Sequence, residues 1–68
     1  MFNAEAWVAQ ELAKHTTPES RAARLASELS FHEMLKASPL KRPSNVTVRD
    51  WAESQRSHDL LITGLQAA

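Results

Sequence analysis

The chain has 68 residues, no Cys, and equal numbers of acidic and basic side chains, so its formal net charge is zero with neutral His. The lack of Cys excludes disulfides and thiolate metal sites, and the missing basic surplus disfavours nucleic-acid binding, which depends on neutralising phosphates. No apolar run approaches the roughly 18 residues that span a membrane, and Glu5 stands where a signal peptide carries Lys or Arg. We therefore expect a cytoplasmic protein.

The composition predicts an all-α protein with one domain over residues 1–68, because strong helix formers dominate and there is one Gly. The first helix is expected over residues 4–15. Asn3 is a favoured N-cap, and Phe2 and Trp7 have the spacing of a hydrophobic staple. The inward stripe of this helix is expected to be Ala4, Val8 and Leu12.

The second helix is expected over residues 18–37. Thr17 is a natural N-cap, Pro18 suits the first helical position, and Pro39 disfavours helical geometry at the residue before it. A stiff connector over residues 38–46 follows, with Leu40 expected to attach it to the core. The stripe expected to pack on the other helices is Ala22, Leu25, Ala26 and Leu29.

The third helix is expected over residues 48–63. Thr47 and Asp50 have the spacing of a capping box, although Asn45 is an alternative cap two residues earlier. Gly64 is the predicted C-terminal stop. The predicted fold is a short N-terminal helix plus an antiparallel helical hairpin, assembled as a homodimeric helical bundle.

The homodimer is predicted from two apolar sides of the second helix. Leu25 and Leu29 lie on one side of the helical wheel, and Phe31 lies on the other. A helix that is apolar on both sides is buried on both sides, and a chain this short gains stability from association. The expected dimer interface is Ala23, Ser27, Phe31, Met34 and Leu35. The alternative is a monomer in which helices 1 and 3 clasp helix 2.

A second surface is predicted for binding another protein. Trp51 has staple spacing to Val46, which favours a local packing role, but Trp is also enriched at interface hot spots. With its polar neighbours Arg49, Gln55 and Arg56 on the third helix, it would form an aromatic anchor with a polar rim. The expected partner-binding residues are Lys41, Arg42, Arg49, Trp51, Gln55 and Arg56.

No catalytic, cofactor or metal site is predicted. His15, His32 and His58 are too widely separated for the i, i+4 pair that binds metal on a helix, and there is no Gly-rich phosphate loop. The best rival function is DNA binding. Residues 24–35 are similar to the opening of a helix-turn-helix with its turn at Ser30–Phe31, and residues 47–52 are similar to the start of a recognition helix.

Residues 17–65, with two long helices and no Cys, resemble the small inhibitors that phages encode, and in particular the quorum-sensing anti-activators. The resemblance lies in overall build and includes no diagnostic motif. It implies a helical homodimer that masks the DNA-binding region of a LuxR-type regulator, and some members also bind a pilus-assembly ATPase. A structural or assembly subunit, or an antitoxin, is the remaining alternative.

Overall fold

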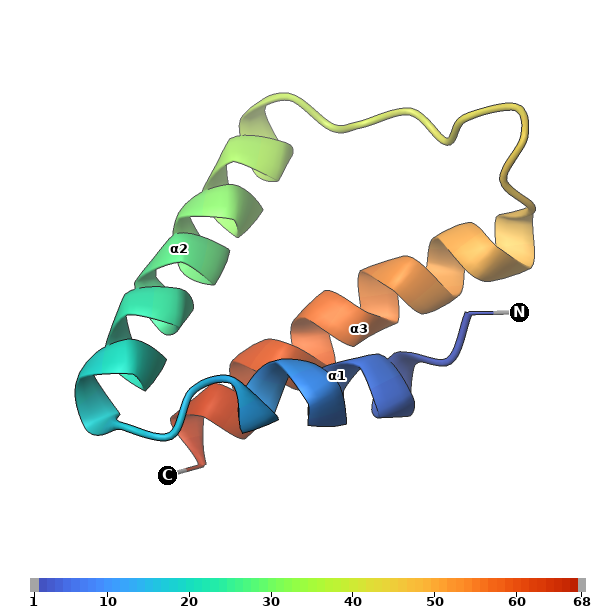
Figure 1. Ribbon diagram of the computed structural model, residues 1–68. Coiled ribbons are helices and arrows are strands. Elements are labelled where there is room, and N and C mark those ends of the chain that lie inside the picture. Colours follow the sequence, from blue (N-terminus) through green and yellow to red (C-terminus); the bar gives the residue numbers. More distant parts are fainter. Residues whose placement is uncertain (1, 68) are drawn as a thin grey trace.

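The computed structural model describes residues 2–67, which form three α-helices and no strand (Figure 1). The helices are α1 (Ala4–Ala13), α2 (Pro18–Ala37) and α3 (Val48–Gln66). The predicted all-α class, with a short N-terminal helix before two longer ones, is confirmed. No helix in this part of the chain combines the length and the apolar character needed to cross a membrane.

All three helices begin where their capping residues predict. The side-chain oxygens of Asn3, Thr17 and Thr47 each accept a hydrogen bond from the backbone N–H three residues further on, at 3.0, 3.1 and 3.1 Å. These bonds satisfy N–H groups that have no partner within the helix. The start of α3 is therefore set by Thr47, and the alternative cap at Asn45 is not used.

The ends of α1 differ in how well the sequence predicts them. At the start, the rings of Phe2 and Trp7 lie 6.4 Å apart, as the staple spacing predicts. The helix ends at Ala13, two residues earlier than expected. The N–H groups of Lys14 and His15 bond to carbonyls three residues back, and this tighter last turn closes the helix.

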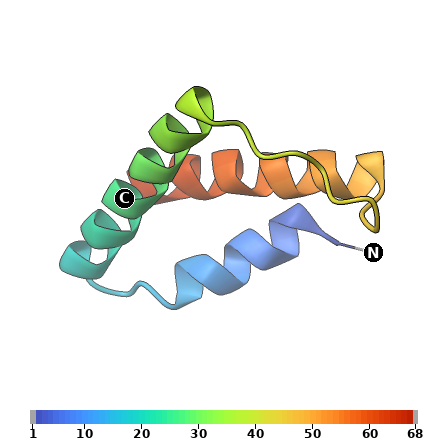
Figure 2. The same ribbon diagram turned by 90° about the horizontal axis from the view of Figure 1, so that it is seen from above.

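The apolar core lies between α1 and α3, which run side by side in the same direction (Figures 1 and 2). Ala4 and Val8 are buried on α1, as the predicted stripe requires, and Leu61 and Leu65 are buried on α3. Several partly buried side chains pack around this cluster: Trp7, Leu12, Leu25 and Leu60. Most of the apolar stabilisation of the chain therefore comes from one pair of helices.

Gly64 lies inside α3, and its predicted role as a helix stop is wrong. α3 continues to Gln66, and Gly64 keeps a negative φ. A Cβ at this position would lie 2.9 Å from Cδ1 of Leu12 on α1. The missing side chain therefore lets the two helices approach closely, which is a tertiary requirement that the local sequence does not reveal.

α2 contacts α3 at one end and diverges from it at the other. Figures 1 and 2 show α2 leaning away from α3, with the connector spanning the open side. α2 packs on α3, and no backbone packing joins α2 to α1 within residues 2–67. The antiparallel pair of long helices is therefore splayed, and the molecule is flat, with principal extents of 38, 28 and 15 Å.

The predicted inward stripe of α2 is only partly correct. Leu25 packs on the core cluster, but Ala22 and Ala26 are exposed and Leu29 is 43% exposed. Phe31 faces α3 as well, so Leu25 and Phe31 do not lie on opposite apolar sides as expected. The reason is the angle of α2, which turns one continuous side of the helix toward α3.

The prediction of a helix-turn-helix in residues 24–35 is also wrong. α2 is an uninterrupted helix from Pro18 to Ala37, so no turn occurs at Ser30–Phe31. A helix-turn-helix needs two helices at a large angle joined by a short turn. This segment cannot supply that motif.

Candidate protein-binding groove

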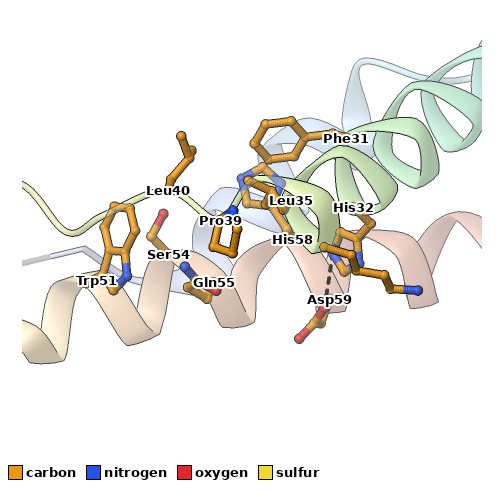
Figure 3. Close-up of a pocket in the computed structure, with 11 residues that line it drawn as sticks. Phe31, His32, Leu35, Pro39, Leu40, Trp51, Ser54, Gln55, His58 and Asp59 are labelled. Atoms are coloured by element: carbon orange, nitrogen blue, oxygen red, sulfur yellow. Dashed lines mark ion pairs between the residues drawn. The ribbon is translucent and has the colours of Figure 1, made fainter.

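The open side of the splayed helices forms a groove, shown in Figure 3. It encloses about 380 Å³ between the C-terminal half of α2, the connector and α3. Apolar and polar side chains both line this groove: Phe31, His32, Leu35, Lys36, Pro39, Leu40, Trp51, Ser54, Gln55, His58 and Asp59. A mainly apolar concavity with a few polar groups is the usual form of a binding site.

His58 closes the groove where α2 meets α3. Its ring lies 5.6 Å from Phe31 and 5.4 Å from Trp7, between the groove and the core. Its Nδ1 is 2.9 Å from Oε2 of Glu28, whose side chain is buried. The imidazole therefore joins α2 to α3 through a polar contact and an aromatic contact at once.

A buried ionic cluster holds the closed end of the groove together. Arg24 on α2 donates from Nη1 to Glu11 on α1 at 2.9 Å, and from Nε to Glu28 at 3.0 Å. Glu11 also accepts from Lys14, and these two cations lower its pKa. Buried carboxylates are tolerated only when such partners are present. Polar contacts therefore help to hold α2 in place, beside the apolar packing of Leu25 on the core.

Residues predicted for two separate surfaces meet in this one groove. Phe31 and Leu35 belong to the predicted dimer interface, whereas Trp51 and Gln55 belong to the predicted partner surface. In Figure 3 the first pair comes from α2 and the second pair from α3. The splay of α2 brings them together, so the two predicted surfaces overlap.

The other predicted interface residues of α2 do not line the groove. Ala23 and Ser27 are exposed, and the side chain of Met34 is 54% exposed beside Phe31. They form a strip next to the groove on the outer side of the helix. Within residues 2–67, no described contact covers this strip.

The predicted cationic residues of the partner surface are divided among three places. Lys41 and Arg42 lie exposed on the connector, where Arg42 donates to the carbonyl oxygen of Val46. Arg49 lines a separate hollow of about 290 Å³ near the start of α3. Arg56 faces the seam between α1 and α3. None of these four cations lines the groove itself.

Arg56 is held by two carboxylates at the seam of α1 and α3. Its Nη2 lies 2.9 Å from Glu5 and 2.9 Å from Glu53. Arg56, followed by the N–H of Ala4, lowers the pKa of Glu53 to about 2. These bonds tie α1 to α3, so the predicted partner-binding role of Arg56 competes with a local structural one.

Sequence reasoning missed several groove residues. Leu40 was expected to attach the connector to the core, but it is 58% exposed at the rim of the groove. Pro39, Ser54 and His58 carry no local signal that assigns them to a site. The spacing of Arg24 and Glu28 is the i, i+4 pairing signal that could have located the ionic cluster.

The described residues hold no group of three His, Asp or Glu side chains that could bind a metal ion. Comparisons with protein-family models, with curated proteins and with solved structures find no match to this chain. Its functional interpretation therefore depends on the groove and on the resemblance in overall build.

Proposed function

We propose that this chain is a non-catalytic inhibitor or adaptor that binds another protein through the groove between α2, the connector and α3. The observation that carries the proposal is the apolar lining of Phe31, Leu35, Leu40 and Trp51, open to solvent along one side of the molecule. Binding sites that hold an amphipathic helix have this character, with apolar anchors from the partner entering a hydrophobic groove.

The charges around the groove favour a partner helix with acidic flanks. Lys41 and Arg42 follow Leu40 directly, and neither forms an ion pair with another described residue. Exposed cations that adjoin a binding surface steer acidic partners and improve specificity. Trp51 supplies the aromatic anchor that hot spots commonly contain.

The finer proposal follows the resemblance to phage anti-activators. The partner is then the DNA-binding region of a bacterial transcription regulator, and occupation of the groove by one of its helices blocks DNA by steric exclusion. An apolar anchor on such a helix would be taken up between Leu35 and Trp51.

Site-specific photo-crosslinking in bacterial cells tests the proposal. Photoreactive p-benzoylphenylalanine replaces Gln55, which lines the groove, or Gln10, which is exposed on α1 as a matched control. We expect one dominant foreign protein crosslinked from position 55 and not from position 10. Equal labelling from both positions, or adducts with abundant chaperones only, would contradict a groove-specific partner.

The crosslinked protein then permits a quantitative test. With the purified partner, Trp51→Ala should weaken binding at least tenfold, since truncation of a hot-spot Trp commonly costs about 2 kcal/mol. If the partner is a transcription regulator, the wild-type chain should release it from operator DNA in a gel-shift assay. Unchanged affinity of the Trp51→Ala variant would place the binding site elsewhere.

A further inference from the structure

The accessible surface of the chain is larger than that of a typical folded monomer of the same mass. Its accessible surface is 4916 Å², whereas a folded monomer of 7.6 kDa is expected to expose about 4,300 Å². The difference of about 600 Å² approaches the share that each partner contributes to the smallest stable interfaces. The flat shape and the splay of α2 are the physical source of this excess.

Large apolar side chains account for part of the uncovered surface at the groove. Leu40 projects at its rim with 58% exposure, and Met34 lies just outside it with 54% exposure. Leu35 and Trp51 are half-buried within it. A second copy of the chain would therefore offer a groove for the apolar side chains of the first copy. Its own apolar side chains would in turn fill the groove of the first.

The two ends of the groove carry opposite charges. Figure 3 shows Leu40 and Trp51 at one end and His32 with Asp59 at the other. The basic pair Lys41–Arg42 follows Leu40 at the first end, and the carboxylate of Asp59, 70% exposed, lies at the second. A two-fold axis through the middle of the groove places the basic end of one copy against the acidic end of the other.

At the second end, Nε2 of His32 lies 3.4 Å from the carboxylate of Asp59, which stays largely exposed. Lys36 also lines the groove, but its ammonium group is paired with Glu33 at 3.0 Å. The formal net charge of the chain is zero, so two copies do not repel each other as whole molecules. Complementary ends and an uncovered apolar centre are the features of a self-complementary interface.

We propose that a second copy of this chain covers the groove in a two-fold arrangement, with Leu40 of each copy packed beside Leu35 of the other. This interface keeps Phe31 and Leu35 of the dimer interface expected from sequence, but it leaves out Ala23, Ser27 and Met34, which lie outside the groove. Where the proposed function also holds, on which this step rests, a foreign partner has to displace the second copy from the groove. Self-association and capture of another protein then exclude each other.

Sedimentation equilibrium of three proteins tests this arrangement: the wild type, Leu40→Gln and Leu29→Gln. Leu29 is the matched control, because it is also exposed but does not line the groove. The wild type should approach twice the chain mass as its concentration rises from micromolar to millimolar. Leu40→Gln should weaken association at least tenfold, while Leu29→Gln should match the wild type. Circular dichroism checks that both variants keep their helices.

The contribution of charge is tested by Asp59→Asn and by added salt. Both should weaken association severalfold, because opposed exposed charges are screened by salt. A wild type that stays monomeric at all concentrations would overturn the inference and leave the proposed function intact. Equal effects of the two Leu variants would place the second copy outside the groove. A dimer without any foreign crosslink from position 55 would instead count against the proposed function alone.

Discussion

The two sides of α3 are used differently. On one side, α1 packs closely along it, with buried Val8, Leu61 and Leu65 and with Leu12 against Gly64. On the other side, α2 packs Leu25 on the same core and joins α3 through the contact of Glu28 with His58, and it then diverges and leaves a groove. A chain with a very small core thus divides the surface of α3 between a packed side and an open side. One helix pair supplies stability, and the second long helix is held at an angle that keeps apolar surface available.

The largest expected effect compares equal truncations on the two sides. Leu61 has no exposed surface, whereas Leu35 is half-buried in the groove. Leu61→Ala should lower the free energy of unfolding by about 3 kcal/mol, because it leaves a cavity in the core. Leu35→Ala should lower it by less than about 1 kcal/mol at concentrations where the chain is monomeric. Urea unfolding measures both, and similar losses would contradict the division into a stabilising side and a binding side.

The close approach of α1 to α3 is tested at Gly64. Gly64→Val should destabilise the fold by about 2 kcal/mol, because the added side chain overpacks against Leu12. Gly64→Ala is the control. Its single Cβ meets only the flexible end of Leu12, and the gain in helix propensity of about 1 kcal/mol offsets that contact. If the Val variant were as stable as wild type, Gly64 would have no packing role.

The polar attachment of α2 is tested at Glu28. Glu28→Gln should cost about 1.5 kcal/mol, because it removes a buried charged acceptor from both Arg24 and His58. Glu33→Gln is the matched control in the same helix, since the exposed Glu33–Lys36 pair contributes little. Thermal unfolding compares the two, and hydrogen exchange should show faster opening of α2 in the first variant. Equal stability of the two variants would mean that α2 is held mainly by apolar contacts.

The smallest expected effect concerns pH at the seam of α1 and α3. Arg56 and the N–H of Ala4 lower the pKa of Glu53 from 4.5 to about 2. Because the folded-state pKa is depressed, Glu53 contributes stability that is complete above pH 4.5 and is lost as the pH falls toward about 2. Glu53→Gln should therefore be less stable than wild type at neutral pH, with the gap closing over this window. Melting temperatures at several pH values measure it, and a constant gap would exclude a role for this ionisation.

Local signals in the sequence predicted the helices and their starts. Asn3, Thr17 and Thr47 act through bonds to the next few residues, so their roles do not depend on the rest of the fold. The inward positions of Ala4 and Val8 followed from helical periodicity for the same reason. Information of this kind was sufficient for the fold class and for most helix boundaries.

Features that depend on contacts distant in sequence were not predicted. Gly64 has the local appearance of a helix stop, and only the approach of Leu12 explains its place inside α3. The groove depends on the angle between α2 and α3, which is set where Glu28 meets His58, thirty residues apart. Local sequence patterns singled out Phe31 and Trp51 as candidate interface residues. They could not show that the two side chains line one groove.

The central claim is that another protein molecule, either a second copy or a foreign partner, covers the groove. The solvent accessibility of the groove tests this claim most directly. The chain has no Cys, so Ser54→Cys in the groove and Ser30→Cys outside it each introduce a unique thiol with little change in size. We expect alkylation of the first thiol to slow severalfold as the protein concentration rises from micromolar to millimolar, and to slow further with a bound partner. The second thiol should react at a constant rate. Equal and concentration-independent rates at the two positions, with or without partner, would show that the groove stays open and would contradict its proposed role.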